Sequence, residues 1–383
     1  MSSVVEDVVD KLFPPFFWSF QGKTLSLWPV INRGYGIEQM KQEQIKKLLN
    51  TLNEYESLGI AEQIDYKKFY LYSLITHSTA IEGSTVTEIE NQLLFDEGIT
   101  AKGRSLQEQM MNLDLKAAYE HSMQLAHQHE DFSVEMLKSL SALVMRNTGA
   151  SYNTAQGSFD ASKGDLRLVG VTAGIGGRSY MNYQKVPAKL EEFCKQLNQR
   201  RSELTNFDDM IAKYLLSFDA HYQLVTIHPW VDGNGRMSRL VMNHLQYEFG
   251  LVPVKIVKED KAEYIQALID SREQESLDPF REFMMEEHIR NISREIEEYK
   301  KSQESDLIKA FSDPIKAFSD PIKERLYQAV SQDGTLNYAE YAAIVGASEA
   351  TVKRRLGDLK KEGAIIRVGS NKTGHWEVNK KNM

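Results

Sequence analysis

Two long stretches of the chain carry apolar residues three and four positions apart, which is the spacing of an amphipathic helix. They are Met210 to Ile227 and Phe280 to Tyr299, and Asp278-Pro279 precedes the second stretch as an N-cap and first-turn pair. The chain has 9 prolines in 383 residues, so few positions interrupt such helices. The pattern therefore predicts a mainly α-helical body.

Extended segments are predicted in few places. From Leu166 to Tyr183 two extended runs flank a Gly174-Ile175-Gly176-Gly177 turn, which predicts a β-hairpin. Near the C-terminus, Ala364 to Val378 alternates around a polar Gly/Asn turn and predicts a second hairpin. Three short helical patterns precede this second hairpin, at Ile322 to Val330, Tyr338 to Val345 and Ser348 to Glu362.

Three helices followed by a hairpin resemble a winged helix-turn-helix, in which the third helix enters the major groove of DNA. That helix carries Lys353, Arg354 and Arg355 near its start, and residues 322–383 have a net charge of +4 while the rest of the chain has −12. Such a basic cluster suits phosphate groups. DNA binding through 322–383 is one expectation, and a protein-docking surface with a solvated basic face is the alternative.

A duplicated heptapeptide separates this tail from the body. IKAFSDP at Ile308 to Pro314 repeats identically at Ile315 to Pro321. One duplication is too short for a solenoid, and a residue before proline avoids the helical region. We therefore predict a linker at 301–321, in which Asp-Pro twice interrupts short helical pieces.

Composition excludes several classes of protein. The first twenty residues lack the basic start and apolar run of a signal peptide, and no apolar run approaches the roughly 18 residues of a membrane span. The single cysteine, Cys194, excludes an internal disulfide and a cysteine-based metal cluster. We expect a cytoplasmic protein without membrane contact.

The segment HPWVDGNGRMSR, from His228 to Arg239, concentrates polar chemistry. Asp-Gly-Asn-Gly does not continue a helix easily, so the helix ending near Ile227 should stop and a new one begin around Asn234 to Arg236. The free N–H groups of a new helix, with glycines that permit close approach, form an anion site suited to phosphate. Arg236 and Arg239 lie three apart on one face and can reach two successive phosphates.

Two further side chains in this segment suit the chemistry of a polyphosphate. Asp232 supplies a hard oxygen for a Mg²⁺ ion bound to the phosphates. His228 faces the same anion with an imidazole that accepts a proton near neutral pH. The segment contains no Walker loop, dinucleotide fingerprint or HExxH motif. A zinc site from His221 and His228 is the alternative to His221 packing in the core.

The twelve residues resemble the Fic motif, H-x-F-x-D/E-G-N-G-R-x-x-R, with Trp230 at the usual phenylalanine. The resemblance covers about Phe69 to Glu287 and implies a helical core with a β-hairpin flap beside the active site. It also implies transfer of AMP from ATP to hydroxyls of Ser, Thr or Tyr on target proteins. The resulting division is an N-terminal helical region (1–100), a Fic core (101–300), the linker (301–321) and a winged helix (322–383).

The resemblance assigns a role to each motif residue. It implies that His228 is the general base and that Asp232 holds Mg²⁺ against the α- and β-phosphates. It implies an anion hole from the backbone N–H groups of Gly233 to Gly235 and the Asn234 side chain. Two arginines would hold the β- and γ-phosphates: Arg236 and Arg239.

Two segments outside the motif also resemble parts of the family. Tyr264-Ile265-Gln266-Ala267-Leu268 resembles a Y-x-x-A-L helix, which implies that Tyr264 packs on adenine; a buried core tyrosine is the alternative. The hairpin at 166–183 would be the flap on which a target protein docks by strand addition. A plain structural hairpin is the alternative there.

The segment Ser78-Thr79-Ala80-Ile81-Glu82-Gly83 resembles the inhibitory motif S/T-x-x-x-E-G/N of one class of the family. The resemblance implies that Glu82 pairs with Arg239, so that ATP binds without its α-phosphorus in line for attack. The alternative is the end of a helix, since Tyr70 to Ile81 has helical period and Gly83 suits a C-cap.

Three functions follow from these observations. The first is protein AMP transfer, self-modification included, restrained by Glu82. The second is a DNA-binding regulator that senses nucleotide, and the third is transfer of another phosphate-containing group by a Fic core. The intact motif favours the first. The sequence leaves open the target, the acceptor residue and whether the chain forms a homodimer.

Overall fold

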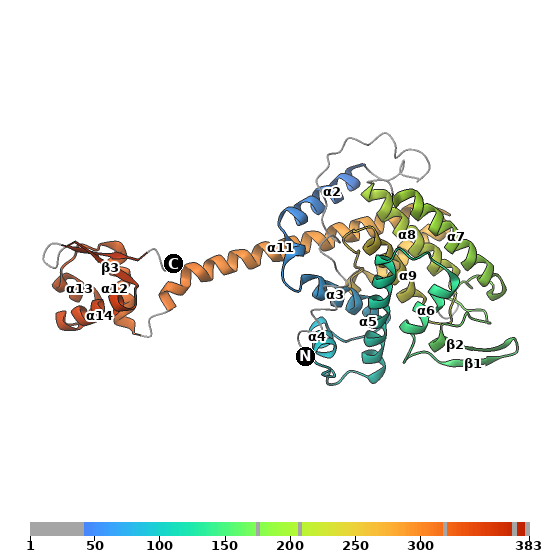
Figure 1. The fold of residues 1–383 in the computed structure, drawn as a ribbon, viewed down its shortest axis with the longest axis horizontal. Coiled ribbons are helices and arrows are strands. Elements are labelled where there is room, and N and C mark those ends of the chain that lie inside the picture. Colours follow the sequence, from blue (N-terminus) through green and yellow to red (C-terminus); the bar gives the residue numbers. More distant parts are fainter. Residues whose placement is uncertain (1–41, 174–176, 206–208, 317–319, 370–373, 380–383) are drawn as a thin grey trace. The chain divides into compact units, whose positions relative to one another are not determined.

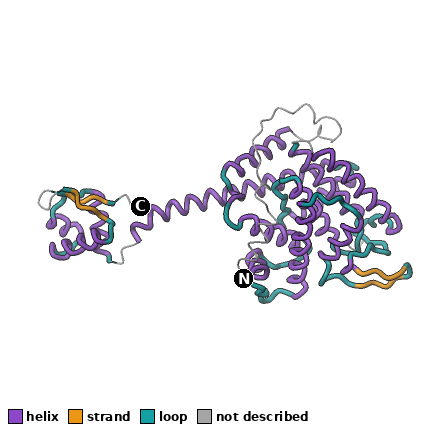
Figure 2. Tube along the Cα trace, in the orientation of Figure 1, coloured by secondary structure: helices purple, strands orange, loops and turns teal. Residues whose placement is uncertain are grey.

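A computed structural model describes residues 42–173, 177–205, 209–316, 320–369 and 374–379, with the side chains of 304–316 left out of the description. The chain divides into two units, and the boundary between them in the sequence lies between residues 296 and 297. The first unit is mainly helical, as predicted, and Figures 1 and 2 show how its helices gather around a central pair. The second unit is small and combines three helices with a hairpin.

Helices α8 and α9 form the central pair of the first unit, and α5 packs against α9 (Figure 1). Both central helices are buried on almost every side, so they are surrounded by other helices and carry no broad polar face. The helices of the unit are α2 (Gln42–Ser57), α3 (Tyr66–Ile81), α4 (Glu88–Asp96), α5 (Leu106–His127), α6 (Val134–Val144), α7 (Val186–Thr205), α8 (Met210–Ile227), α9 (Asn234–Glu248), α10 (Lys261–Glu273) and the first part of α11 (Asp278–Lys316).

Helix α3 packs against α5, α4 and α9, and its C-terminal end lies near the start of α9. Eleven of its residues are buried, and buried Thr79 donates a hydrogen bond to Asn112 Oδ1 on α5 at 2.7 Å. The helix ends at Ile81, and Glu82 is its C-cap. The end predicted from the period of Tyr70 to Ile81 is therefore confirmed.

Hairpin structure in the first unit differs from the prediction. The regular hairpin lies at β1 (Ser151–Thr154) and β2 (Gly157–Asp160), which pair antiparallel. The segment 166–183, called the flap segment below, has a single bridge between Thr172 and Ser179. Its turn residues 174–176 lie outside the described residues.

A side chain connects the two runs of the flap segment. The backbone carbonyls of Val169 and Met181 accept hydrogen bonds from the guanidinium of Arg167. The two runs are therefore held together partly by an arginine side chain inserted between them.

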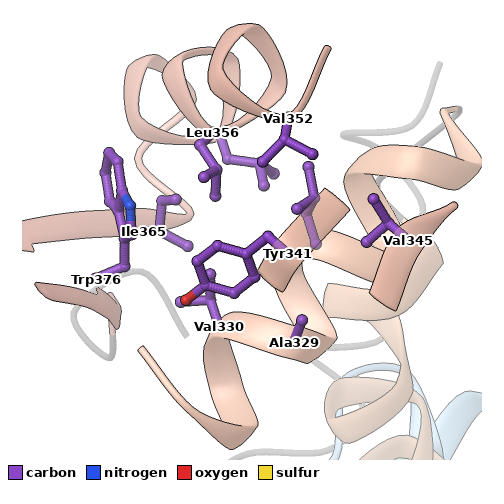
Figure 3. Packing of buried hydrophobic residues seen from close by; sticks show 10 residues of the cluster. Ala329, Val330, Tyr341, Val345, Val352, Leu356, Ile365 and Trp376 are labelled. Atoms are coloured by element: carbon purple, nitrogen blue, oxygen red, sulfur yellow. The ribbon is translucent and has the colours of Figure 1, made fainter. Parts of the chain in front are cut away.

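The second unit has the order of elements predicted for a winged helix: α12 (Pro321–Gln332), α13 (Tyr338–Val345), α14 (Glu349–Lys361), β3 (Ile365–Val368) and β4 (His375–Val378). Its core gathers side chains from all three helices and both strands, with Tyr341 at its centre (Figure 3). The Tyr341 hydroxyl donates to the backbone oxygen of Asp333 at 2.8 Å, which satisfies the polar end of a buried ring.

Helix α11 corrects one expectation about the duplicated heptapeptide. The helix continues to Lys316, so it passes through Pro314 and the first Asp-Pro does not interrupt it. Pro314 lies in the last turn, so the helix continues for only two residues beyond it. The second Asp-Pro starts a helix, since Asp320 accepts from the Ile322 N–H at 3.0 Å as the N-cap of α12. Among the described helices, none is both long and apolar enough to cross a membrane.

Candidate functional site

The loop between α8 and α9 turns sharply because two residues adopt the left-handed conformation. His228 ends α8 with φ 53° and ψ 62°, and its N–H donates to the Leu224 oxygen at 3.0 Å. Gly233 precedes α9 with φ 80°, and a Cβ there would lie 2.8 Å from Met145 Sδ. Glycine is therefore required at 233 by both backbone and space. The predicted stop and restart of the helix is confirmed.

Asn234 braces this loop. Its Oδ1 accepts from the Trp230 N–H at 3.1 Å, and its Nδ2 donates to the Trp230 oxygen at 2.9 Å. The indole of Trp230 is 1% exposed and donates to the Gly164 oxygen at 3.1 Å, so the large ring anchors the loop in the core. In this structure the Asn234 side chain holds the loop, and its expected contribution to the anion hole stays a prediction.

The first turn of α9 offers backbone donors to an anion. The Gly233 N–H is used by Asp232 Oδ1 at 2.6 Å, and no side chain caps the helix. The N–H groups of Asn234, Gly235 and Arg236 therefore have no acceptor within the helix. Together with the guanidinium groups of Arg236 and Arg239, they form what we call the anion site.

Both arginines of the anion site are buried and incompletely bonded. Each is 3% exposed, and Arg236 Nε and Arg239 Nη1 have no hydrogen-bond partner among the described residues. Arg236 is held at the end of α6 by the Val144 oxygen at 3.4 Å and Met145 Sδ at 3.2 Å. Buried donors without partners are rare in proteins and point to a missing acceptor. A phosphate oxygen is an acceptor of the right charge.

His228 presents one ring nitrogen as a base. Its Nδ1 lies 3.2 Å from the Val225 oxygen, and a carbonyl only accepts, so the proton resides on Nδ1 and Nε2 keeps its lone pair. The ring of Tyr180 from the flap segment stacks on the imidazole, with centroids 3.7 Å apart and planes at 14°. Burial, with a smaller contribution from the nearby Arg167 charge, lowers the pKa of His228 to about 4.

Asp232 and His221 lie in different surroundings, one exposed at the loop and the other buried in the core. The Asp232 side chain is 65% exposed at the loop, 3.7 Å from Arg236 Nη2, and can reach an ion bound to phosphates in the anion site. His221 is buried and stacks on Phe280 at 5.0 Å, which is the core packing weighed against a zinc site. Within the described ranges no cluster of three or more metal-binding side chains occurs. One carboxylate with phosphates and water is the usual magnesium set, and Asp232 fits it.

The ion pair expected between Glu82 and Arg239 is present. Glu82 Oε1 lies 2.6 Å from Arg239 Nη2, while Ser78 accepts from the same guanidinium through its Oγ at 2.8 Å and its backbone oxygen at 3.0 Å. A Cβ added at Gly235 would collide with Glu82 Oε1 and lie 3.1 Å from Arg239 Nη1. The carboxylate of Glu82 therefore lies against the first turn of α9, inside the anion site.

Charge and backbone both fix Glu82 there. Burial raises its pKa, but the Arg239 charge and hydrogen bond outweigh burial, so the net pKa of Glu82 is lowered and the group is ionised at neutral pH. Gly83 follows with φ 103°, a backbone conformation that favours glycine. Ser78 and Glu82 thus contact Arg239, and the pairing of Glu82 with Arg239 is the one that the sequence implied. The effect of this contact on activity remains a prediction.

Tyr264 is 2% exposed and lies among core side chains. Its hydroxyl is 3.2 Å from His221 Nε2, and its ring lies beside Phe280 and Phe283. These contacts are those of the core tyrosine that was the alternative at this position. Packing on adenine stays a prediction.

Two residues of the flap segment were missed by the sequence analysis. Arg167 is 1% exposed and donates from Nε to the His228 backbone oxygen at 2.8 Å. Tyr180 covers the His228 ring. The one signal in the sequence was a basic residue in an otherwise apolar extended run, at Leu166 to Val171.

In the second unit the three basic residues of α14 are not equivalent. Lys353 and Arg354 are exposed. Arg355 is partly buried and pairs with Asp320 Oδ2 at 2.6 Å and Asp358 Oδ2 at 3.2 Å. Its guanidinium therefore holds the start of α12 to α14, and two of the three expected cations face solvent.

Family models match both units. Residues 131–246 match the Fic/DOC family, and residues 319–366 match a winged helix-turn-helix DNA-binding family. Protein adenylyltransferase fic-1 of Caenorhabditis elegans is 24% identical over 234 residues, which are 61% of this chain and 42% of the relative. Protein adenylyltransferase Fic of Drosophila melanogaster is 28% identical over 208 residues, 52% of this chain and 37% of the relative. The chain spans less than half the length of these curated relatives.

Solved structures agree at the level of the fold. A Fic domain containing signaling protein from Bacteroides thetaiotaomicron has a TM-score of 0.54 at 20% identity, covering 67% of this chain and 98% of that one. A fragment of Fic-1 from C. elegans has a TM-score of 0.53 at 23% identity, covering 68% and 74%. The predicted fold class, a helical Fic-type body with a winged helix-turn-helix, is confirmed.

Proposed function

Since this chain is a Fic-domain protein with a C-terminal winged helix, we propose that its first unit transfers AMP from ATP to a Ser, Thr or Tyr hydroxyl of a protein. Two buried arginines with unpartnered donors at the start of α9 carry the proposal, because they call for an anion with several oxygens. The relatives named protein adenylyltransferase support AMP as the transferred group.

In the proposed reaction, the acceptor hydroxyl oxygen attacks the α-phosphorus of ATP. His228 Nε2 takes the hydroxyl proton, a bond from oxygen to the α-phosphorus forms, and the bond from the α-phosphorus to the bridging oxygen breaks. Pyrophosphate leaves. A neutral imidazole is ready for this step, because the pKa of His228, about 4, keeps Nε2 unprotonated near neutral pH.

The anion site positions the triphosphate for this displacement. Arg236 and Arg239 would bind the β- and γ-phosphates, with Arg236 Nε and Arg239 Nη1 as the donors that await an acceptor. The N–H groups of Asn234 and Gly235 would stabilise charge on the phosphate nearest His228. Asp232 would hold a Mg²⁺ ion, which neutralises phosphate charge when bound. Positioning and charge stabilisation then supply most of the rate.

Glu82 would restrain this reaction. Its carboxylate uses Arg239 Nη2 and lies against Gly235, where a phosphate oxygen would otherwise approach. An ionised carboxylate there repels the γ-phosphate and displaces the triphosphate from an in-line pose. ATP then binds unproductively until the Glu82 contact with Arg239 opens.

Labelled ATP tests the proposed function. The Glu82→Gly protein is incubated with Mg²⁺ and ATP carrying ³²P at the α- or the γ-position, with and without a cell lysate. We expect protein-bound label from the α-position and none from the γ-position, and a mass increase of AMP on a hydroxyl residue. Protein-bound label from the γ-position would contradict AMP transfer and would show that the protein transfers phosphate.

The flap segment is the proposed docking site for the target. Thr172 and Ser179 already form a bridge, and a target strand would add to the exposed edge of this short ladder. Hydroxyls of the chain itself that reach His228 would be modified in the same way. Replacing edge residues should then lower target modification more than ATP binding.

Binding of DNA by the second unit is a second proposal, supported by the match to a DNA-binding winged helix and by exposed Lys353 and Arg354. A regulator of transcription that also modifies proteins is compatible with both units. An electrophoretic mobility assay of the full chain on random duplex DNA, at several salt concentrations, tests this second proposal.

A further inference from the structure

We propose that Arg167 is a positioning residue that joins the flap segment to the backbone of the catalytic histidine, so that His228 is aimed only while the flap segment is in place. The inference rests on the proposed function of His228. Arg167 touches neither the imidazole ring nor the anion site through any described hydrogen bond. It acts through the backbone.

The hydrogen bonds of Arg167 connect three separate parts of the chain. Its Nε donates to the His228 oxygen at 2.8 Å, its Nη1 to the Val169 oxygen at 2.8 Å, and its Nη2 to the Met181 oxygen. Its backbone N–H donates to the Pro229 oxygen at 3.1 Å. One residue therefore binds both sides of the flap segment and two consecutive carbonyls of the catalytic loop.

The conformation of His228 shows why this attachment matters. A left-handed backbone is unfavourable for a residue with a side chain and persists only where its surroundings impose it. The bond from Arg167 to the His228 carbonyl is one of those restraints, and the bond from the His228 N–H to Leu224 is another. Rotation of this peptide would move the imidazole, and misplacement by about 1 Å costs on the order of 10² in rate.

The charge of Arg167 is unfavourable at this buried position, so the benefit of an arginine here lies in the geometry of its hydrogen bonds. Arg167 is 1% exposed, and its described hydrogen bonds all go to neutral carbonyls, so its buried charge has no carboxylate against it in these contacts. Burying a cation is costly, and burial lowers the pKa of Arg167. The charge also disfavours the imidazolium that forms when His228 takes the proton. The benefit must therefore come from the planar fork of donors and not from the charge.

The Tyr180 ring connects the same parts from the other side. Its backbone N–H donates to the Val171 oxygen at 3.0 Å, which sets its place in the flap segment, and its ring stacks on His228. When the flap segment shifts, Arg167 and Tyr180 move together against the histidine. A target strand that docks on the flap segment would thereby order the base that activates its hydroxyl.

The test introduces Arg167→Met and Arg167→Lys separately into the full chain that already carries Glu82→Gly, and compares each variant with that parent. Lysine keeps the charge but donates from a single nitrogen atom. It therefore cannot reach the three separate carbonyl oxygens that the planar guanidinium of Arg167 binds. We expect both variants to lower kcat for AMP transfer by at least about tenfold, with KM for ATP changed less than about threefold. Hydrogen exchange of peptide 169–181 should accelerate in both.

Arg201→Met is the control for the loss of a buried arginine away from the loop at 228. Arg201 is 6% exposed and also donates to backbone oxygens, those of Glu130 and His129, but unlike Arg167 it pairs with the carboxylates of Asp131 and Glu248. It should lower the thermal midpoint at least as much as Arg167→Met does, while kcat and the exchange of peptide 169–181 stay within about twofold.

Two results would overturn the inference: unchanged kcat and exchange in folded Arg167→Met, or full recovery in Arg167→Lys. If Glu82→Gly itself transfers no AMP, the proposed function fails, and the exchange data still decide whether Arg167 holds the flap segment.

Discussion

The two basic pairs of this protein, Arg236 with Arg239 and Lys353 with Arg354, lie near the starts of helices but differ in exposure. The first pair is 3% exposed and fixed by contacts with α6 and α3. The second pair is on the surface. Buried arginines with unpartnered donors define a site for one ligand of fixed shape, whereas exposed cations attract any phosphate chain through a field that salt screens.

The difference also explains why the first pair holds an internal carboxylate. A preorganised anion site attracts carboxylates as well as phosphates, and Glu82 occupies it. The charges of an exposed pair are solvated by water and screened by salt ions, so no carboxylate of the protein has to neutralise them. Arg355 illustrates the intermediate case, since its charge is already used by Asp320 and Asp358.

The largest expected effect concerns the buried site. In the Glu82→Gly protein, His228→Ala should lower AMP transfer on the order of 10²–10⁴ fold, because the base acts on the reacting proton. ATP affinity, measured by calorimetry, should stay within about threefold, since the anion site is intact. Transfer at the parent rate would remove His228 from the mechanism.

The next effect is on ligand discrimination. In the Glu82→Gly background, Arg239→Ala should weaken ATP binding by roughly 10–100-fold, from the loss of charge-assisted hydrogen bonds worth about 1.5–3 kcal/mol. AMP, which lacks the β- and γ-phosphates, should bind nearly as before. Equal losses for both nucleotides in calorimetric titrations would place Arg239 elsewhere than at the distal phosphates.

The exposed pair should respond more weakly. If the second unit binds DNA, Lys353→Ala and Arg354→Ala should each reduce the slope of log affinity against log salt by about one, without regard to sequence. Arg355→Ala is the internal comparison and should lower the thermal midpoint of the second unit more than the slope. Binding that ignores salt would contradict a phosphate-contact surface and favour protein docking.

The smallest effect is a pH response. The pKa of His228 is about 4, below its ordinary value, so the base form is present from pH 8 down to pH 5 and is lost as pH falls through 4. Nuclear magnetic resonance of the ring protons, with the His228 signal assigned by its loss in His228→Ala, should show no titration of His228 between pH 6 and 8; burial also lowers the pKa values of His221, His244 and His288. Tyr180→Ala uncovers the ring and should raise this pKa toward 6.5. An ordinary titration in the parent protein would refute the burial of His228.

Local patterns predicted the helices well. Met210 to Ile227 and Tyr338 to Val345 coincide with α8 and α13, because apolar period and end signals agree there. The hairpin β1–β2 was missed because its strands are four residues long and mostly polar, and its one apolar pair, Tyr152 with Phe159, is visible only after pairing. Four-residue strands with one apolar residue each carry too little alternation to detect.

The candidate site was predictable as a set of residues but not as a set of bonds. The resemblance brought Glu82 and Arg239 together across 157 positions, and the ion pair is present. The use of Asn234 to brace Trp230 depends on which way a side chain turns, which spacing does not determine. Arg167 was missed for the same reason, since the direction of its side chain decides that it reaches the His228 carbonyl, 61 positions away.

The central claim is that Glu82 holds an AMP-transferring site in a restrained state through Arg239. The most direct measurement is the initial rate of label transfer from α-³²P ATP by the parent protein, Glu82→Gly, Arg239→Ala and the double variant, all verified as folded. We expect at least about a tenfold gain in Glu82→Gly, equivalent to roughly 1.4 kcal/mol, and little gain from the same change when Arg239 is absent. A Glu82→Gly protein that binds ATP and transfers AMP at the parent rate would contradict the central claim.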